Sequence, residues 1–185
     1  MKKKVIYSII IVSVIIILSV AVTYAVYTFS GSVNISGTSE CFDVNYVKGQ
    51  DIGSDSNPAK FVLANNYTEG LSSVIKVNLK DTCTITNGTG TLYLNTDTSV
   101  TSSTILSGKV LKYQVLDGTT PVGSGIVSSA ESIEIYKDIP ITTTVKTITV
   151  YIWLDGNLVT EQNQNEILSS VYKGHISMDI KSGDK

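Results

Sequence analysis

The chain begins with a basic segment that is followed by a long apolar one. Lysines occupy positions 2–4, and residues 5–29 carry no charge. A helix that crosses a bilayer needs about 20 apolar residues, and this stretch supplies them. Because basic residues that flank a span stay in the cytoplasm, the pattern predicts an N-terminal hydrophobic helix with the rest of the chain outside the cell membrane.

The sequence leaves open whether this hydrophobic helix is removed. Residues 23–25 (Thr-Tyr-Ala) have the small-x-small form of a signal-peptidase site, which predicts cleavage between Ala25 and Val26. The apolar stretch of 18 residues at positions 5–22 exceeds the roughly 7–15 of an ordinary signal core, as expected for a retained anchor. Residues 1–25 are therefore either a signal peptide or a membrane anchor. An uncleaved chain would contact the membrane through residues 5–27.

Beyond this segment, the pattern changes to the two-residue alternation that is typical of half-buried strands. Hairpin turns are expected at Asn87-Gly88, at Asp117-Gly118 and at residues 155–157 (Asp-Gly-Asn). Only residues 160–172 suit a surface loop or one short helix. The predicted strands lie within residues 42–47, 72–80, 82–86, 90–95, 110–116, 133–136, 146–154 and 175–180.

The composition of the part after residue 25 also favours strands. It contains 16 Val, 15 Ile and 20 Thr but only 3 Ala. Side chains that branch at Cβ lose rotamer freedom in a helix and pack well on a pleated sheet. We therefore predict an all-β fold: a single antiparallel β-sandwich with Greek-key, jelly-roll-like connections over residues 41–185, preceded by an extended segment at residues 26–40.

Charge and composition argue against several function classes. All 14 basic residues are Lys, so the chain has no Arg with which to clamp a phosphate or a carboxylate in bidentate fashion. The exported part has 11 Lys and 16 acidic residues, which disfavours nucleic-acid binding. No phosphate loop, zinc-binding helix or nucleophile elbow is present. We therefore expect no enzyme, no cofactor and no metal.

Cys41 and Cys83 are the only cysteines, and both fall in the part that is expected to be exported. Disulfides persist outside the cytoplasm, so we predict a bridge between them rather than two buried thiols. Tyr151 and Trp153 share the strand face opposite the apolar one. They either belong to a second buried layer or form an exposed aromatic patch that contacts a sugar or a protein.

Three weaker candidates have simple structural explanations. His175 could be a surface ligand, but an edge or strand-end histidine without a task is the favoured interpretation. Residues 51–57 space oxygen donors as calcium loops do, yet the bidentate Glu of such loops is missing, and a solvated turn is the alternative. Sequons occur at Asn34, Asn66 and Asn87, a pattern that is common by chance in a chain rich in Asn and Thr.

The N-terminal lysines, the apolar run and residues 23–30 (Thr-Tyr-Ala-Val-Tyr-Thr-Phe-Ser) resemble the exported surface proteins of low-GC Gram-positive bacteria grouped around TasA and camelysin. The resemblance covers only about the first thirty residues. Val26 and Thr28 depart from the compact Ala-Tyr-Phe form of that family, and the two cysteines are not part of its pattern.

The resemblance implies a structural or adhesive protein of the cell surface or biofilm matrix, either anchored in the membrane or released after cleavage. Its partners would be further copies of itself, as a homopolymer, or other matrix proteins. A segment just after the cut would lend a strand to the next subunit. In this chain that segment is residues 26–35, with Phe29, Val33 and Ile35 as its apolar positions. The alternative is a membrane-tethered monomeric module that binds a carbohydrate or a protein.

Overall fold

The computed structural model describes residues 26–36, 41–48, 59–60, 63–98, 101–130, 132–168, 170 and 172–183. The predicted signal or anchor at residues 1–25 and the candidate calcium loop at residues 51–57 lie outside this set. In the described ranges, no helix is long and apolar enough to cross a membrane. Val26 and Tyr27, the last two residues of the predicted membrane contact, already belong to the first strand.

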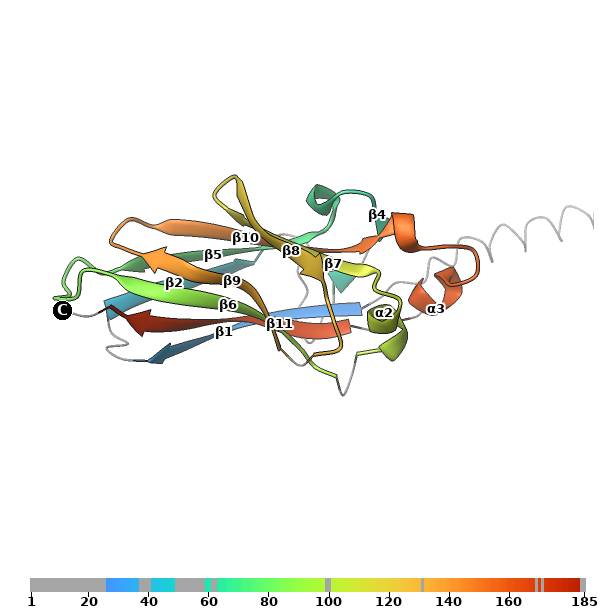
Figure 1. Cartoon of the computed structure of the whole chain (residues 1–185), viewed down its shortest axis with the longest axis horizontal. Coiled ribbons are helices and arrows are strands. Elements are labelled where there is room, and N and C mark those ends of the chain that lie inside the picture. Colours follow the sequence, from blue (N-terminus) through green and yellow to red (C-terminus); the bar gives the residue numbers. More distant parts are fainter. Residues whose placement is uncertain are drawn as a thin grey trace, which may run out of the picture.

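Two sheets face each other and form a β-sandwich, as the alternation predicts (Figure 1). Sheet A has the order β3 (Ala59–Lys60), β1 (Val26–Ser36), β11 (Tyr172–Ser182), β6 (Gly88–Thr96) and β9 (Ser132–Ile141). Sheet B has the order β2 (Phe42–Lys48), β5 (Leu71–Leu79), β10 (Lys146–Asp155), β7 (Leu111–Asp117) and β8 (Thr120–Ile126). The short β4 (Leu63–Ala64) pairs beside β10.

Most strand pairs are antiparallel. The two parallel pairs are β1 with β11 and β4 with β10. β7 and β8 form the hairpin that was expected at Asp117-Gly118, and Gly118 supplies the positive φ of +61° that this tight turn requires.

The helical segments among the described residues are short. They are η2 (Tyr67–Glu69), α2 (Ser103–Ser107), η3 (Gly156–Leu158) and α3 (Gln164–Leu168). α2 and α3 lie at one end of the sandwich, which we call the helical end (Figure 1). The short helix expected within residues 160–172 is thereby confirmed as α3, and its Ile167 is buried. β1 also begins at the helical end, because Tyr27 pairs with Tyr172 at the start of β11.

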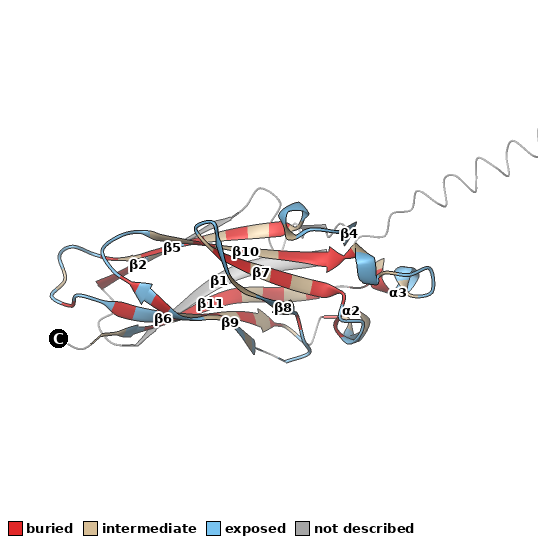
Figure 2. Ribbon diagram, turned by 45° about the horizontal axis from the view of Figure 1, so that its top comes forward, coloured by how far each residue is buried: buried red, intermediate tan, exposed pale blue. Residues whose placement is uncertain are grey.

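The core lies between the inner faces of the two sheets. In β10 the predicted apolar face is confirmed, since every second side chain from Ile148 to Leu154 is at most 2% exposed. Strands of both sheets show this alternation of buried with partly exposed residues (Figure 2). The inner faces also contain Ile75, Val77, Leu79, Leu92, Leu94, Ile176, Met178 and Ile180.

The predictions of two hairpins are wrong, and the physical reason is the same for both. β5 belongs to sheet B and β6 to sheet A, so residues 80–87 cross between the sheets instead of folding back at Asn87-Gly88, and residues 82–86 form no strand. Asp155 caps η3 by accepting from the backbone N–H of Asn157, and the chain then continues through α3 to sheet A. The turn-forming residues at both places were recognised, but these turns lie in connections that lead from one sheet to the other.

The sandwich also begins earlier in the chain than expected. Residues 26–36 form β1, which pairs along its length with β11 inside sheet A. The sheets therefore start at Val26 rather than at Cys41.

The predicted disulfide between Cys41 and Cys83 is confirmed, with the two Cα atoms 5.6 Å apart. Cys41 is 8% exposed and directly precedes β2, whereas Cys83 lies in the crossing from sheet B to sheet A. The backbone N–H of Lys80 donates to the carbonyl of Cys41, so a hydrogen bond and the bridge hold the same two segments together.

Removing this bridge should destabilise the protein without changing its fold. The sequence separation of the two cysteines is 42 residues, and closing a loop of that size stabilises by about 3–4 kcal/mol in the chain-entropy model. We expect the double variant Cys41→Ala/Cys83→Ala to lose this amount in urea denaturation. The reduced wild type should match the double variant. An unchanged urea midpoint after reduction would contradict this role.

Candidate functional site

The segment predicted to donate a strand is β1, and in this structure it pairs within its own chain. Its parallel register with β11 runs over ten positions, from Tyr27 beside Tyr172 to Ser36 beside Lys181. The three apolar positions Phe29, Val33 and Ile35 stand opposite Gly174, Met178 and Ile180. All three of these β11 residues are buried. The apolar positions of β1 are thus paired with buried positions of β11.

On the other side of β1, β3 covers the start of the strand. β3 pairs with Val26 and Tyr27, and among the described strands none pairs with this side beyond Tyr27. β1 is thus close to an edge of sheet A for most of its length. An uncovered edge presents backbone N–H and C=O groups that can pair with another strand.

The aromatic pair of β10 is covered by a segment that sequence reasoning missed. Tyr67 of η2 lies over the outer face of β10, with its ring centroid 5.1 Å from that of Tyr151 and 6.4 Å from that of Trp153. Trp153 is consequently 9% exposed, whereas Tyr151 and Tyr67 are half-buried. The two residues form neither a second sheet layer nor an open patch. A single 3₁₀ turn buries the tryptophan.

Local chemistry around Tyr67 explains this cover. The side-chain oxygen of Asn66 accepts from the backbone N–H of Thr68 at 3.2 Å, which caps η2. Gly70 lies against β10 so closely that a Cβ there would stand 2.7 Å from the carbonyl oxygen of Ile152 and 2.8 Å from the Cβ of Trp153. The signal in the sequence is therefore a capped turn that runs from Asn66 to Gly70, which the strand alternation does not reveal.

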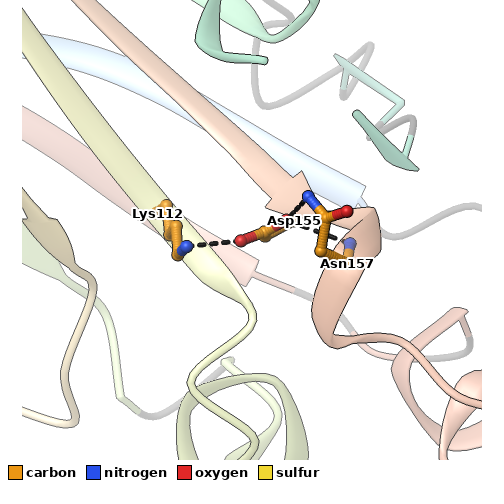
Figure 3. A network of polar contacts seen from close by, with 3 residues as sticks. All are labelled: Lys112, Asp155 and Asn157. Carbon is orange, nitrogen blue, oxygen red and sulfur yellow. Dashed lines mark hydrogen bonds and ion pairs between the residues drawn. The ribbon is translucent and has the colours of Figure 1, made fainter. Parts of the chain in front are cut away.

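A buried carboxylate lies where β10 ends. Asp155 is 5% exposed and forms an ion pair with Lys112 of β7 (Figure 3). The backbone N–H and the side-chain amide of Asn157 donate to its other oxygen at 3.0 and 2.9 Å. The hydrogen bond from Lys112 holds the pKa of Asp155 below its ordinary value, although burial opposes this. Both carboxylate oxygens are thus satisfied, and the network joins two strands to η3.

A second charged network joins the two sheets. The ammonium of Lys146 lies 2.6 Å from the carboxylate of Asp117. Tyr136, on β9 of sheet A, donates its hydroxyl to the same carboxylate oxygen at 3.0 Å. Burial, followed by the hydrogen bond to Asp117, raises the pKa of Tyr136 to about 12. This phenol therefore stays neutral and remains a donor over the physiological range.

A cavity of about 750 Å³ opens at the helical end. Its walls come from the connection between β6 and β7, which contains α2, and from the residues that follow β8. Hydroxyl side chains dominate the described part of the lining, in which Lys109 is the only charged residue. The hydroxyl residues are Thr98, Thr101, Ser103, Ser107, Ser128 and Ser129, and Leu106, Ile126 and Val127 complete the lining. Sequence reasoning missed this site because its residues come from two separate connections.

The remaining candidates are brought into no common site. His175 is half-exposed on β11, in register with Asn95 of β6 and Ser30 of β1. Within the part of the chain that the structure describes, no group of three or more His, Cys, Asp or Glu residues could hold a metal ion. Of the sequons, Asn66 caps η2 and Asn87 accepts from the backbone N–H of Gly183 through its carbonyl.

The Asp155 network yields a prediction with a defined pH dependence. The substitution Asp155→Asn leaves Lys112 partly buried without its counter-charge, and we expect the free energy of unfolding at pH 7 to fall by about 2–4 kcal/mol. Because the pKa of Asp155 is lowered on folding, its contribution is present above the ordinary value of 3.8 and is lost as the pH falls below it.

Urea denaturation between pH 2.5 and pH 7 measures this difference. Wild type and variant should converge at the acidic end, and a difference that stays constant over the whole range would contradict the ion pair. The variant Lys112→Met is the matched control, because it removes the partner and leaves the carboxylate.

Tyr67 should control the environment of Trp153, the only tryptophan in the chain. We expect Tyr67→Ala to shift the tryptophan emission to longer wavelength and to cost about 1–2 kcal/mol, since it removes an aromatic contact and admits water. Tyr93→Ala, on β6 of the other sheet, should leave the emission unchanged. Equal spectra for wild type and Tyr67→Ala would show that η2 does not cover Trp153.

Comparison with family models and with curated proteins identifies no relative of this chain. No protein-family model matches this chain, and no curated protein matches it. The geometry described above is therefore the basis on which a function can be inferred.

Proposed function

We propose that this protein is an exported structural or adhesive subunit of a bacterial cell surface or biofilm matrix, and that it assembles by exchanging β1 between copies. The observation that carries the proposal is the ten-position register of β1 on β11, next to an edge that no described strand covers beyond Tyr27. The backbone pairing that β1 makes with β11 of its own chain can also be made with β11 of a second copy. Such an exchange replaces each contact by an identical one, so it costs little free energy.

The place of β1 in the chain supports this exchange. β1 is the first described strand, and only its C-terminal end leads on into the sandwich. Once residues 1–25 are removed, the strand can leave β11 after its two residue pairs with β3 open, and no other described strand pairs with it. Its departure uncovers the edge of β11, which then accepts β1 of a neighbour. Repeated head-to-tail exchange of this kind yields an open fibre.

A retained N-terminal segment would act in the opposite way. β1 starts directly after Ala25 and at the helical end, so an uncleaved anchor would hold this end against the membrane and keep β1 in place. Cleavage between Ala25 and Val26 is therefore the step that would permit assembly. The intact mass of the protein in the membrane and in the medium identifies which form is present.

The expected connectivity belongs to the same proposal. We infer a Greek-key, jelly-roll-like sandwich, supported by a chain that passes repeatedly from one sheet to the other, as between β5 and β6 and again between β9 and β10. In such a topology the first and last strands can be neighbours, as β1 and β11 are here.

Cross-linking of two different variants tests strand exchange. Ser30 and His175 are register partners, and adjacent strands bring their Cα atoms within the range that a disulfide spans. We expect a mixture of cleaved Ser30→Cys protein and cleaved His175→Cys protein to form mixed covalent dimers under mild oxidation. Mass spectrometry with one variant isotopically labelled distinguishes mixed dimers from like pairs.

The control replaces His175→Cys by Lys80→Cys, an exposed position just after the end of β5 that lies away from the helical end. Mixed dimers should exceed this control several-fold. If the two mixtures give equal yields, β1 stays on its own β11 and the assembly mechanism is wrong.

A monomeric binding module is the second candidate function. The observation that favours it is the packed pair Tyr67 and Tyr151 on the outer face of sheet B, since both side chains are only half-buried and keep some surface for contact with a sugar or a protein. Under this alternative, adhesion would depend on Tyr151 and would persist in protein that gives no mixed dimers.

A further inference from the structure

The cavity at the helical end is separate from β1 exchange, and it has the chemistry of a ligand site. Leu106 and Val127 form an apolar floor, being 7% and 0% exposed. Ile126, at 41% exposed, forms part of the rim. The volume of about 750 Å³ falls within the roughly 300–1,000 Å³ that is usual for small-ligand pockets.

The hydroxyl groups around this floor divide into structural and available ones. Thr101 is structural, since its hydroxyl donates to the carbonyl of Lys173 and accepts from the N–H of the same residue, both at 3.1 Å. Ser128 accepts from the backbone N–H of Ala130, which leaves its own O–H to donate. Ser103 and Ser129 are exposed. A ligand with several hydroxyls can therefore exchange hydrogen bonds with this wall.

Lys109 gives the cavity its charge. Its side chain is exposed, and it takes part in none of the three ion pairs found among the described residues. None of the described residues that line the cavity is acidic. Lys109 also has a φ of +54°, a left-handed conformation that is costly for a residue with a side chain. The turn after α2 thus places a positive charge beside the hydroxyls of the cavity.

We propose that this cavity binds a sugar or polyol unit that carries an anionic group, either a carboxylate or a phosphodiester. The ammonium of Lys109 contacts the anionic oxygen as a point charge, which suits either group because it needs no bidentate geometry. Serine hydroxyls pair with the hydroxyls of the ligand, and Leu106 with Ile126 packs against its C–H groups. The site therefore takes an anionic polyol of a wall or matrix polymer, and it does so whether or not β1 exchanges.

Binding of small probes to the full chain in a non-ionic detergent tests this site. The probes are glycerol 3-phosphate and glucuronate, with glycerol and glucose as neutral counterparts in a phosphate-free buffer. We expect each anion that binds to shift the amide NMR resonances of residues 103–109 and 126–129. A response to only one of the two anions supports the site and identifies its source polymer.

Two variants separate charge from hydroxyl recognition. Lys109→Gln should weaken the anionic probes about three- to five-fold, as expected for a contact at an exposed position, and should abolish their salt dependence. Ser103→Ala/Ser129→Ala should weaken them a few-fold and retain the salt dependence. Lys80→Gln, an equal loss of charge away from the helical end, should change nothing.

Three results would overturn the proposal. In the first, neither anion shifts the resonances of the cavity residues. In the second, neutral and anionic probes bind equally well. In the third, the Lys109→Gln variant binds the anionic probes as tightly as the wild type does. Lys109 is exposed, and the dispersion of the remaining NMR resonances shows that the variant is folded.

Discussion

The parallel pairing of β1 with β11 is the contact on which the arrangement of sheet A depends. β11 contributes Ile176, Met178 and Ile180 to the core, and its free side would be a sheet edge if β1 did not cover it. The strand that completes the sheet is also the one next to the expected cleavage site. Under the proposed function, this single pairing would link the integrity of the sandwich to the release of the chain from the membrane and to pairing with another copy.

Two networks of charged residues in the described part of the chain maintain structure. Lys112 and Asp155 join β7 to the end of β10, whereas Asp117 and Lys146 reach across to Tyr136 in the opposite sheet. These groups are partly buried, so each network is strong enough to orient its strands and none offers a free catalytic group. Lys109 differs, because it carries its charge at the mouth of a hydroxyl-lined cavity. The helical end thus differs from the rest of the sandwich, and it is there that we propose ligand recognition.

Much of the fold could be predicted because strand alternation is a local property. The inner face of β10, the hairpin at Gly118, the helix at α3 and the disulfide all followed from short patterns or from the number of cysteines. The failures came where a turn sequence serves a crossing. Asn87-Gly88 and Asp155-Gly156 look like hairpin turns, but the strands on either side belong to different sheets. Turn propensity fixes where the chain bends and leaves open which sheet receives the next strand.

The sequence by itself determined that this chain is a β protein that begins with an uncharged apolar segment and has two cysteines able to pair. These conclusions rest on composition and on periods of two residues, which need no knowledge of distant contacts. Only the tertiary structure decided that β1 lies beside the last strand, that Tyr67 covers Trp153, and that two connections enclose a cavity. Each of these joins residues far apart in the chain, and their meeting depends on how the two sheets pack, which no local pattern encodes.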